Sequence, residues 1–527
     1  MLSRLLQIQA VLTLAQSKTT TPKVRRKHCT LRGSLHSPYT REDNKSKNLN
    51  ITENLILNRN CDIFLTKITK YGSDLMRRIL FYCAMLAAKT SMFILKLLGR
   101  NASYLPGKIA LTIDKHFLGG LTQPKTVIAV TGTNGKTTVS NLLNSILSEN
   151  GYSITNNSLG SNVQAGIATT LLEDSTFAGK PKKDIAILEI DERSSLRIYP
   201  YIKPDYLICN NIMRDSLARN AHTEFISFII NSAIPETTKV ILNADDLVCA
   251  MLAPNNKNRL YFGLDIDKSH EVSPLYLQDI VYCPECGELL EAEYIRYNHI
   301  GRLHCSNCSF KSPTPDFVIT EVNRDRNTFT ISHNGKDDVY NLINDNIVNL
   351  YNFCGLTALL TDLGLSYEQI AAGFEKTKIV KSRFDKINAG KLSITMQLSK
   401  GQNPTASARC FSYVAKCPGN NKAIIFVGDD FDPLESPCWF FDSNYSYLKD
   451  SSINQIIFSG PRSKDQYLRA CIAGIPTEKM KIIADSTAGP EILDINLSQE
   501  IYVLYGPYMV KQANTVKDKL IKIGKEV

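Results

Sequence analysis

The stretch TVIAVTGTNGKTTVSNLLNSILSENG, residues 126–151, decides the fold of this chain. Its opening run, TVIAV, is mostly apolar and rich in β-branched residues, which is typical of a buried strand in a parallel sheet. A glycine-rich turn follows, and apolar residues then recur at helical spacing up to Gly151, a residue suited to end a helix. The stretch therefore predicts a strand, a turn and a helix in direct succession.

The turn between these two elements, VTGTNGKTT (130–138), has the composition of a phosphate-binding loop. Backbone N–H groups of a glycine-rich turn at a helix N-terminus bind phosphate oxygens. Lys136 can reach the terminal phosphates, and the Thr137 hydroxyl is placed to bind Mg²⁺. We therefore expect a site for ATP or a similar triphosphate with Mg²⁺. Its candidate nucleotide-binding residues are Gly132, Thr133, Asn134, Gly135, Lys136, Thr137 and Thr138.

Strands and helices alternate on both sides of this loop. Short apolar runs at 185–190, 206–210 and 239–243 are separated by helical stretches, which indicates a parallel sheet covered on both faces. Two helices are expected at 350–364 and 366–376. A second alternation follows, with strands expected at 394–398, 423–427, 455–459 and 502–506.

The fold class expected from these patterns is α/β, with a P-loop central domain and a Rossmann-like C-terminal α/β domain. We place a basic, disordered extension at 1–75, an amphipathic helix and lead-in at 76–124, the ATP-binding domain at 125–382 and the last domain at 383–527.

Residues 281–313 form a separate motif inside the ATP-binding domain. The spacing Cys283-x2-Cys286-x18-Cys305-x2-Cys308 fits a Cys₄ zinc ribbon. Four cysteines leave no open position on Zn²⁺, so the predicted site is structural, and nearby His299 and His304 are expected to be bystanders. The other ten cysteines are scattered, as in proteins of a reducing compartment.

The net charge of +10 comes mostly from the N-terminus, where residues 1–41 hold eight Lys or Arg and no acidic residue. The rest of the chain is close to balanced, so we expect no nucleic-acid partner. The extension fits either an organellar transit peptide or, as we prefer, a disordered extension or an upstream start with the working start near Met76. The apolar run at 79–98 is interrupted at 89–91, which favours an amphipathic helix over a membrane span.

The loop Gly132-Thr133-Asn134-Gly135-Lys136-Thr137 resembles the ATP loop of the Mur ligase superfamily, the ATP-dependent amide-forming enzymes of peptidoglycan, folylpolyglutamate and cyanophycin synthesis. The resemblance implies that Glu189 in LEIDE (188–192) holds Mg²⁺ and that Lys136 and Glu189 are catalytic. It also implies nucleotide-binding roles for Asn243 and Asp246 in NADD and for Arg383 in KSRFD. The neighbouring Asp191 and Glu192 remain open between Mg²⁺ binding and solvated loop charge.

A Cys₄ ribbon in the ATP domain marks one branch of this superfamily, the synthetase subunits of lipid II isoglutaminyl synthase. The resemblance implies that ATP phosphorylates the α-carboxyl of D-glutamate in lipid II and that ammonia then gives D-isoglutamine. The last histidine of the chain is His333, and no Cys–His glutaminase pair is evident in the sequence. A second protein is therefore expected to supply ammonia, and the resemblance implies a GatD-type glutamine amidotransferase in a heterodimer. The expected location is cytoplasmic, peripheral at the inner face of the membrane.

The segment DPLESPCWFFD (432–442) departs from the family pattern D-G-x-D-x-S-W-x-W-D. When the two are anchored on Trp439, Asp442 keeps the place of a family aspartate. The resemblance implies that Asp442, or as second choice Asp432, supports the partner's catalytic pair. Both residues could also be ordinary loop carboxylates. The alternative functions are another Mur-type ligase, which adds an amino acid to a muropeptide or folate, and a diverged subunit uncoupled from its glutaminase.

Overall fold

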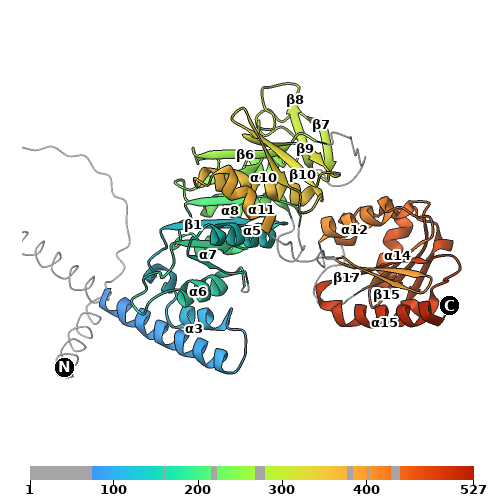
Figure 1. Ribbon diagram of the computed structural model, residues 1–527, viewed down its shortest axis with the longest axis horizontal. Helices are drawn as coiled ribbons and strands as arrows, with labels where there is room; N and C mark the ends of the chain where they lie inside the picture. The colour runs from blue at the N-terminus through green and yellow to red at the C-terminus, as the bar shows by residue number, and fades with distance from the viewer. Residues whose placement is uncertain are drawn as a thin grey trace, which may run out of the picture. The chain divides into compact units, whose positions relative to one another are not determined.

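The computed structural model describes residues 74–526, apart from 159–160, 215–221, 267–278, 377–383, 400–402 and 429–438. The described residues form a central domain, which ends with α11 at Lys376, and a C-terminal domain from Phe384 onward (Figure 1). The predicted extension at 1–75 lies outside the described residues up to residue 73.

The central domain is built on a mixed sheet in the order β11-β10-β9-β6-β5-β4-β1-β3-β2. The pairs from β2 to β9 are parallel, and β10 and β11 extend the sheet as an antiparallel end. The strands are β1 (Thr126–Thr131), β2 (Ile154–Asn156), β3 (Ile185–Glu189), β4 (Tyr206–Cys209), β5 (Lys239–Asn243), β6 (Arg259–Leu264), β9 (Phe317–Asn323), β10 (Thr328–His333) and β11 (Lys336–Asn341). The predicted parallel sheet is confirmed, and the antiparallel end is an addition to it.

Helices cover both faces of this sheet, as a doubly buried parallel sheet requires. Alternate residues of β1 show the division: Ile128 and Val130 pack under α5 and α10, whereas Val127 and Ala129 pack on the opposite core. The helices are α5 (Lys136–Glu149), α6 (Gln164–Glu173), α7 (Ser195–Ile198), α8 (Thr223–Ala233), α9 (Leu247–Ala250), α10 (Ile347–Asp362) and α11 (Tyr367–Lys376).

The first described element is a continuous helix, Asp74–Leu97, followed by α3 (Leu105–Ile113) and α4 (Phe117–Gly120). One face of the long helix is buried against the central domain through Phe81, Met85 and Met92. Lys89, which we expected to interrupt an apolar run, donates hydrogen bonds of 2.8 Å to the carbonyls of Leu172 and Ser175. By length and composition alone the helix could cross a membrane, and its outward face is apolar rather than polar.

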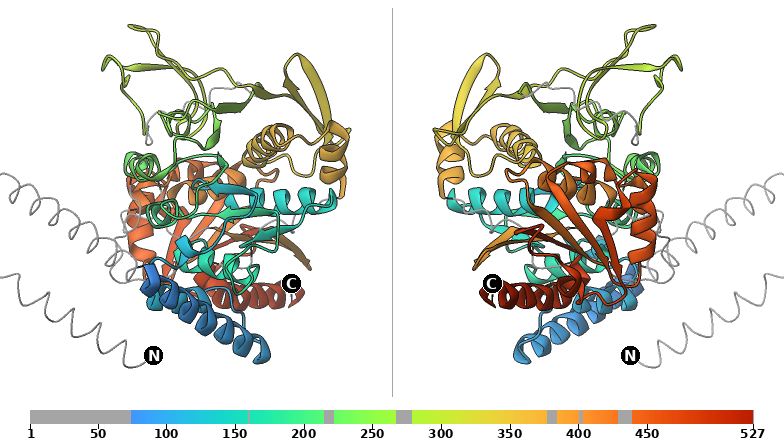
Figure 2. Two further views of the ribbon diagram at one scale, coloured as in Figure 1. Left: turned by 90° about the vertical axis from the view of Figure 1, so that its left-hand side faces the viewer. Right: turned by 90° about the vertical axis from the view of Figure 1, so that its right-hand side faces the viewer.

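The predicted ribbon forms a small hairpin of its own, β7 (Leu290–Tyr297) and β8 (Ile300–Cys305). Figure 2 shows the yellow-green loops of this insertion projecting from the rest of the central domain.

The C-terminal domain has a second sheet in the order β12-β13-β17-β14-β15-β16, parallel except for β12. Helices on both faces enclose two apolar cores. All four strands predicted here are present. The elements are β12 (Phe384–Ala389), β13 (Leu392–Leu398), α12 (Pro404–Lys416), β14 (Lys422–Val427), α13 (Trp439–Asp442), β15 (Ile453–Ser459), α14 (Ser463–Ile472), β16 (Met480–Ile483), β17 (Glu500–Tyr505) and α15 (Val510–Glu526).

Candidate functional site

The phosphate loop joins the end of β1 to the start of α5, at the carboxyl edge of the parallel sheet. Ligands of open α/β sheets bind at this edge, where successive connections leave in opposite directions. Gly132 and Gly135 have φ angles of 115° and 92°, which favour glycine. A Cβ at Gly132 would lie 2.8 Å from the Asn211 carbonyl oxygen, and one at Gly135 would collide with the Asn352 side chain. Both glycines are therefore required by the loop's conformation and by its close neighbours.

A segment after β4, residues 210–214, clamps this loop from the side. The backbone N–H of Thr133 donates to the Asn211 carbonyl at 2.8 Å, and that of Asn134 donates to Asn211 Oδ1 at 2.9 Å. The N–H of Met213 donates to Thr133 Oγ1 at 2.8 Å. This clamp could not be predicted from the sequence. The short polar side chains before Ile212 follow no sequence motif that would identify them as partners of the phosphate loop.

The loop lysine is buried beside a carboxylate. Lys136 Nζ lies 2.8 Å from Glu192 Oε1 and 2.5 Å from the Gly132 carbonyl oxygen. Burial alone would lower the pKa of Lys136, but Glu192, supported by Glu189 and Asp191, raises it above its ordinary value. Glu192 itself is only 2% exposed. Of the two readings left open for Glu192, solvated loop charge is therefore wrong.

The predicted magnesium donors lie on the two elements that flank the loop. Glu189 ends β3 and pairs in register with Val130 of β1, and Thr137 lies exposed in the first turn of α5. Glu189 is partly exposed, and its carboxylate accepts a long hydrogen bond, 3.5 Å, from Asn162 Nδ2. A hydroxyl and a carboxylate beside a phosphate loop fit Mg²⁺, which prefers oxygen ligands. Asp191 instead caps a short 3₁₀ turn by accepting from the Arg193 N–H.

The NADD motif lies at the end of β5, on the same edge of the sheet. Asn243 Nδ2 donates to the Asn210 carbonyl at 2.9 Å, which places it beside the clamp segment. Asp246 is fully buried and accepts from the N–H groups of Ile212, at 2.7 Å, and Cys249, at 3.0 Å. Asp246 is thus held inside the protein, where it joins the ends of β4 and β5. The predicted nucleotide residue Arg383 lies outside the described residues.

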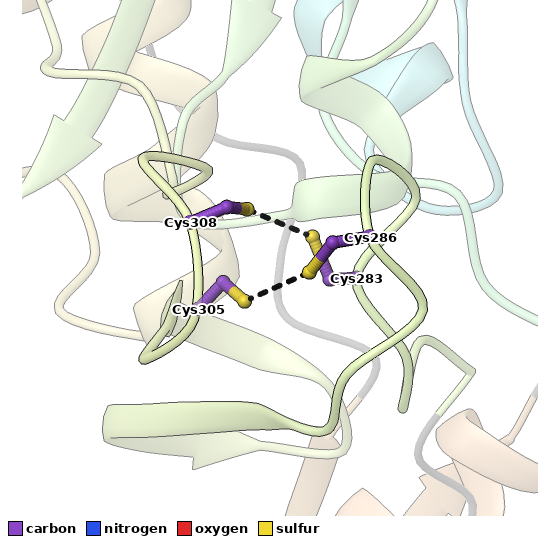
Figure 3. A group of neighbouring side chains, drawn as sticks. All are labelled: Cys283, Cys286, Cys305 and Cys308. Carbon is purple, nitrogen blue, oxygen red and sulfur yellow. Dashed lines mark hydrogen bonds between the residues drawn. The ribbon is translucent and has the colours of Figure 1, made fainter.

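The four ribbon cysteines come together from two facing turns (Figure 3). Their sulfur atoms all lie within 4.8 Å of one another, and the pairs Cys283–Cys308 and Cys286–Cys305 are each 3.5 Å apart. Four sulfurs at about 2.3 Å from one Zn²⁺ lie about 3.8 Å apart in a tetrahedron. The geometry therefore fits a structural zinc ion, and the cysteine group includes neither His299 nor His304.

Of the two candidate aspartates of the last domain, the structure describes Asp442. Asp442 is the last residue of α13, and its partial burial raises the pKa of its carboxyl. Asp432 lies outside the described residues. Of the two candidates, Asp442 is therefore the one that the described residues place on a helix.

Family models match both domains. The Mur ligase middle domain matches residues 130–343, and the MurT ligase C-terminal domain matches residues 400–506. A pseudomurein peptide ligase type C from Methanothermus fervidus shares the fold with a TM-score of 0.56 and 20% identity, over 77% of this chain and 81% of its own. MurF from Acinetobacter baumannii does so with a TM-score of 0.55 and 17% identity, over 79% and 80%. Fold and site together define a Mur-type ligase.

Two curated relatives narrow this class further. The MurT subunit of lipid II isoglutaminyl synthase (glutamine-hydrolyzing) from Streptococcus pneumoniae is 31% identical over 402 residues, which are 75% of this chain and 88% of the relative. The subunit of the same name from Staphylococcus aureus is 30% identical over 396 residues, 75% and 87% of the two chains. The chain belongs to the MurT family, ATP-dependent ligases of the Mur type that act in peptidoglycan synthesis.

Proposed function

We propose that this chain is the synthetase subunit that amidates the D-glutamate α-carboxyl of lipid II to D-isoglutamine. The observation that carries the proposal is the phosphate loop with its buried lysine and flanking carboxylates, in a chain whose MurT relatives bear the name of that reaction. The fold alone would allow other Mur-type substrates, since fold does not determine function.

The proposed reaction has two steps. A carboxylate oxygen of D-glutamate attacks the γ-phosphorus of ATP, and ADP leaves, which gives an acyl phosphate. Ammonia then attacks the acyl carbon, loses a proton, and inorganic phosphate leaves. ATP supplies the phosphoryl group, and Mg²⁺ neutralises its charge.

The chain's own residues position and stabilise these groups. Backbone N–H groups between Gly132 and Thr138 would bind phosphate oxygens at the start of α5, with Arg383 and Asn243 on the nucleotide. The Lys136 cation would stabilise charge on the transferred phosphoryl group. Thr137 and Glu189 would hold the metal ion.

Ammonia requires a second protein under this proposal. We infer a GatD-type glutaminase that forms a heterodimer with the chain, because the MurT relatives are named as subunits of a glutamine-hydrolysing enzyme. Asp442, or else Asp432, would orient the partner's catalytic histidine, as the carboxylate of a catalytic triad does.

We also propose that this cytoplasmic enzyme meets its lipid-linked substrate at the membrane surface through the helix Asp74–Leu97. Leu86, Phe93 and Leu97 are 60%, 62% and 71% exposed on its outward face. Arg77 and Arg78 are exposed near its start and complement anionic headgroups. The opposite face is packed along the domain, so the helix would lie on the membrane rather than cross it.

The test is amidation of lipid II with ATP and Mg²⁺, with ammonium or glutamine as nitrogen source, with and without a GatD-type partner. We expect amidation from ammonium by the chain alone, and from glutamine only with the partner. Amidation from ammonium but never from glutamine would identify a diverged, uncoupled subunit. No amidation from either source, with ATP bound, would overturn the proposal and favour a ligase that adds an amino acid.

A further inference from the structure

One buried side chain of the zinc ribbon lies at the edge of the central sheet that holds the phosphate loop. His299 lies at the turn between β7 and β8 and is 3% exposed. Its Nε2 lies 3.2 Å from Asp246 Oδ1, and its Nδ1 lies 3.0 Å from Asp279 Oδ2. The imidazole therefore bridges two carboxylates, one after β5 and one just before the ribbon. Such a buried bridge is not needed for the hairpin itself, whose strands are paired by their backbones.

Both carboxylates also contact the clamp segment that holds the phosphate loop. Asp246 Oδ2 accepts from the Ile212 N–H at 2.7 Å, and Asp279 Oδ1 lies 2.6 Å from Arg214 Nε. Met213, which lies between Ile212 and Arg214, is hydrogen-bonded to Thr133 of the phosphate loop. The path from the ribbon to the phosphate loop is thus a chain of short, mostly buried contacts within one domain.

A second connection runs from the same hairpin to Asp245, the neighbour of Asp246. The Gly301 N–H donates to the Asp245 carbonyl oxygen at 2.7 Å, and Arg302 Nε lies 3.3 Å from its Oδ1. On the other side of this carboxylate, the Tyr351 hydroxyl of α10 donates to Oδ2 at 2.8 Å. The hairpin thus fixes the NADD turn at two consecutive residues.

We propose that the ribbon is a structural part of the ATP site, with His299 as a positioning residue that couples zinc occupancy to nucleotide affinity. The coupling would act through the 210–214 segment: an ordered hairpin holds His299 in place, His299 and Asp279 hold that segment, and the segment holds the loop for phosphate. This inference rests on the proposed ATP site. It adds a role for the ribbon beyond structural zinc binding.

Zinc binding would affect this path of contacts from the ribbon to the phosphate loop because the hairpin lies between the two cysteine pairs. Three residues separate Cys286 from the start of β7, and β8 ends at Cys305. Closing the four thiolates around one ion fixes the base of the hairpin, so the turn that carries His299 is held from its opposite end. Coupling between two binding sites is reciprocal, so bound nucleotide must strengthen zinc binding by the same factor as zinc strengthens nucleotide binding.

The first measurement compares ATP affinity and zinc content of the full chain and its His299→Gln variant. We expect the variant to retain one zinc ion per chain and to bind Mg²⁺-ATP about tenfold more weakly. His333→Gln is the matched control, because it also removes an imidazole–carboxylate contact, 2.8 Å to Asp338, in the same domain. Among the residues that the structure describes, His333 has no hydrogen bond to the loop or to its clamp, so the control should bind ATP as the native chain does.

The second measurement needs no variant. The zinc affinity of the native chain is measured by equilibrium competition with a chromogenic chelator, with and without Mg²⁺-ATP. We expect nucleotide to raise the zinc affinity several-fold, and His299→Gln to abolish this increase if it folds. Equal zinc affinities in the native chain with and without nucleotide, while ATP binds, would overturn the inference and leave the proposed function intact. Failure of the native chain to bind ATP would instead overturn the proposed function.

Discussion

Lys136 Nζ lies 2.8 Å from Glu192 Oε1, and both side chains are nearly inaccessible to solvent. A buried ion pair contributes little compared with apolar residues of equal size, but removing one partner leaves an uncompensated charge and costs about 3–5 kcal/mol. The lysine that would serve phosphate is therefore held in place by Glu192, a residue outside the loop motif.

Replacing either member of this pair should destabilise the chain, and replacing both should do so by less than the sum. Glu192→Gln leaves a buried cation, and Lys136→Met leaves a buried carboxylate. In Lys136→Met/Glu192→Gln neither charge remains, so we expect a coupling energy of about 2 kcal/mol from thermal unfolding without nucleotide. Additive effects of the two substitutions would show that the pair is not formed in solution.

The strands around this pair were predictable because they are short, apolar and buried on both faces. β1, β3, β4 and β5 occur within a residue or two of the expected runs, and the helix after the loop ends before Gly151 as expected. β10 and β11, which form the antiparallel end of the sheet, were not predicted. Their sequences, TFTISH and KDDVYN, mix polar and apolar residues, because antiparallel strands can face water on one side of the sheet.

The residues of the site were predictable only where they belong to a local sequence motif. The loop glycines, Lys136 and the four cysteines follow from spacing alone. Glu192 and His299 do not, because their partners are 56 and 53 residues away in sequence, Lys136 and Asp246 respectively, and only the tertiary fold brings them together. A histidine near cysteines suggests a zinc ligand, but His299 instead contacts a carboxylate at the edge of the central sheet.

The pH dependence of stability should reveal the charge on His299. Burial alone would lower its pKa, but Asp246 and Asp279 raise it to about 10, while Arg214 faces Asp279 from the other side. A raised folded pKa gives stability that is complete below about pH 6.5, the unfolded value, and is lost as pH rises through about 10. The Tm difference between the native chain and His299→Gln should therefore shrink from pH 6.5 to 10. A constant difference would mean that the imidazole is neutral in the folded protein.

Removing zinc should unfold the ribbon locally. Cys286→Ser deletes one of four ligands, so we expect loss of bound zinc by elemental analysis and rapid tryptic cleavage at Arg302 and Lys311. Cys471→Ser is the control, since Cys471 is a partly buried thiol of α14 in the other domain. Retention of one zinc per chain in Cys286→Ser would contradict a four-cysteine site.

The outward face of the helix Asp74–Leu97 should bind anionic vesicles. Placing a charge in an apolar contact with lipid is costly, so Leu86→Glu/Phe93→Glu should reduce co-sedimentation at least tenfold without lowering Tm. Leu468→Glu is the control, because Leu468 is 54% exposed on α14. Unchanged vesicle binding by the double variant would exclude this face, and a shift from dimer to monomer would identify a second copy of the chain as its occupant.

The role of Asp442 can be separated from phosphoryl transfer by changing the nitrogen source. If its carboxylate orients the histidine of a partner glutaminase, Asp442→Asn should lower glutamine-dependent amidation at least 100-fold, because an amide cannot hold the imidazole in the required tautomer. Ammonium-dependent amidation needs no glutaminase and should stay unchanged. Asp518→Asn, an exposed carboxylate of α15, is the control for general charge loss. Full glutamine-dependent activity in Asp442→Asn, together with its loss in Asp432→Asn, would transfer the role to Asp432. Retention in both variants would mean that the altered segment at 432–442 has no part in the partner's chemistry.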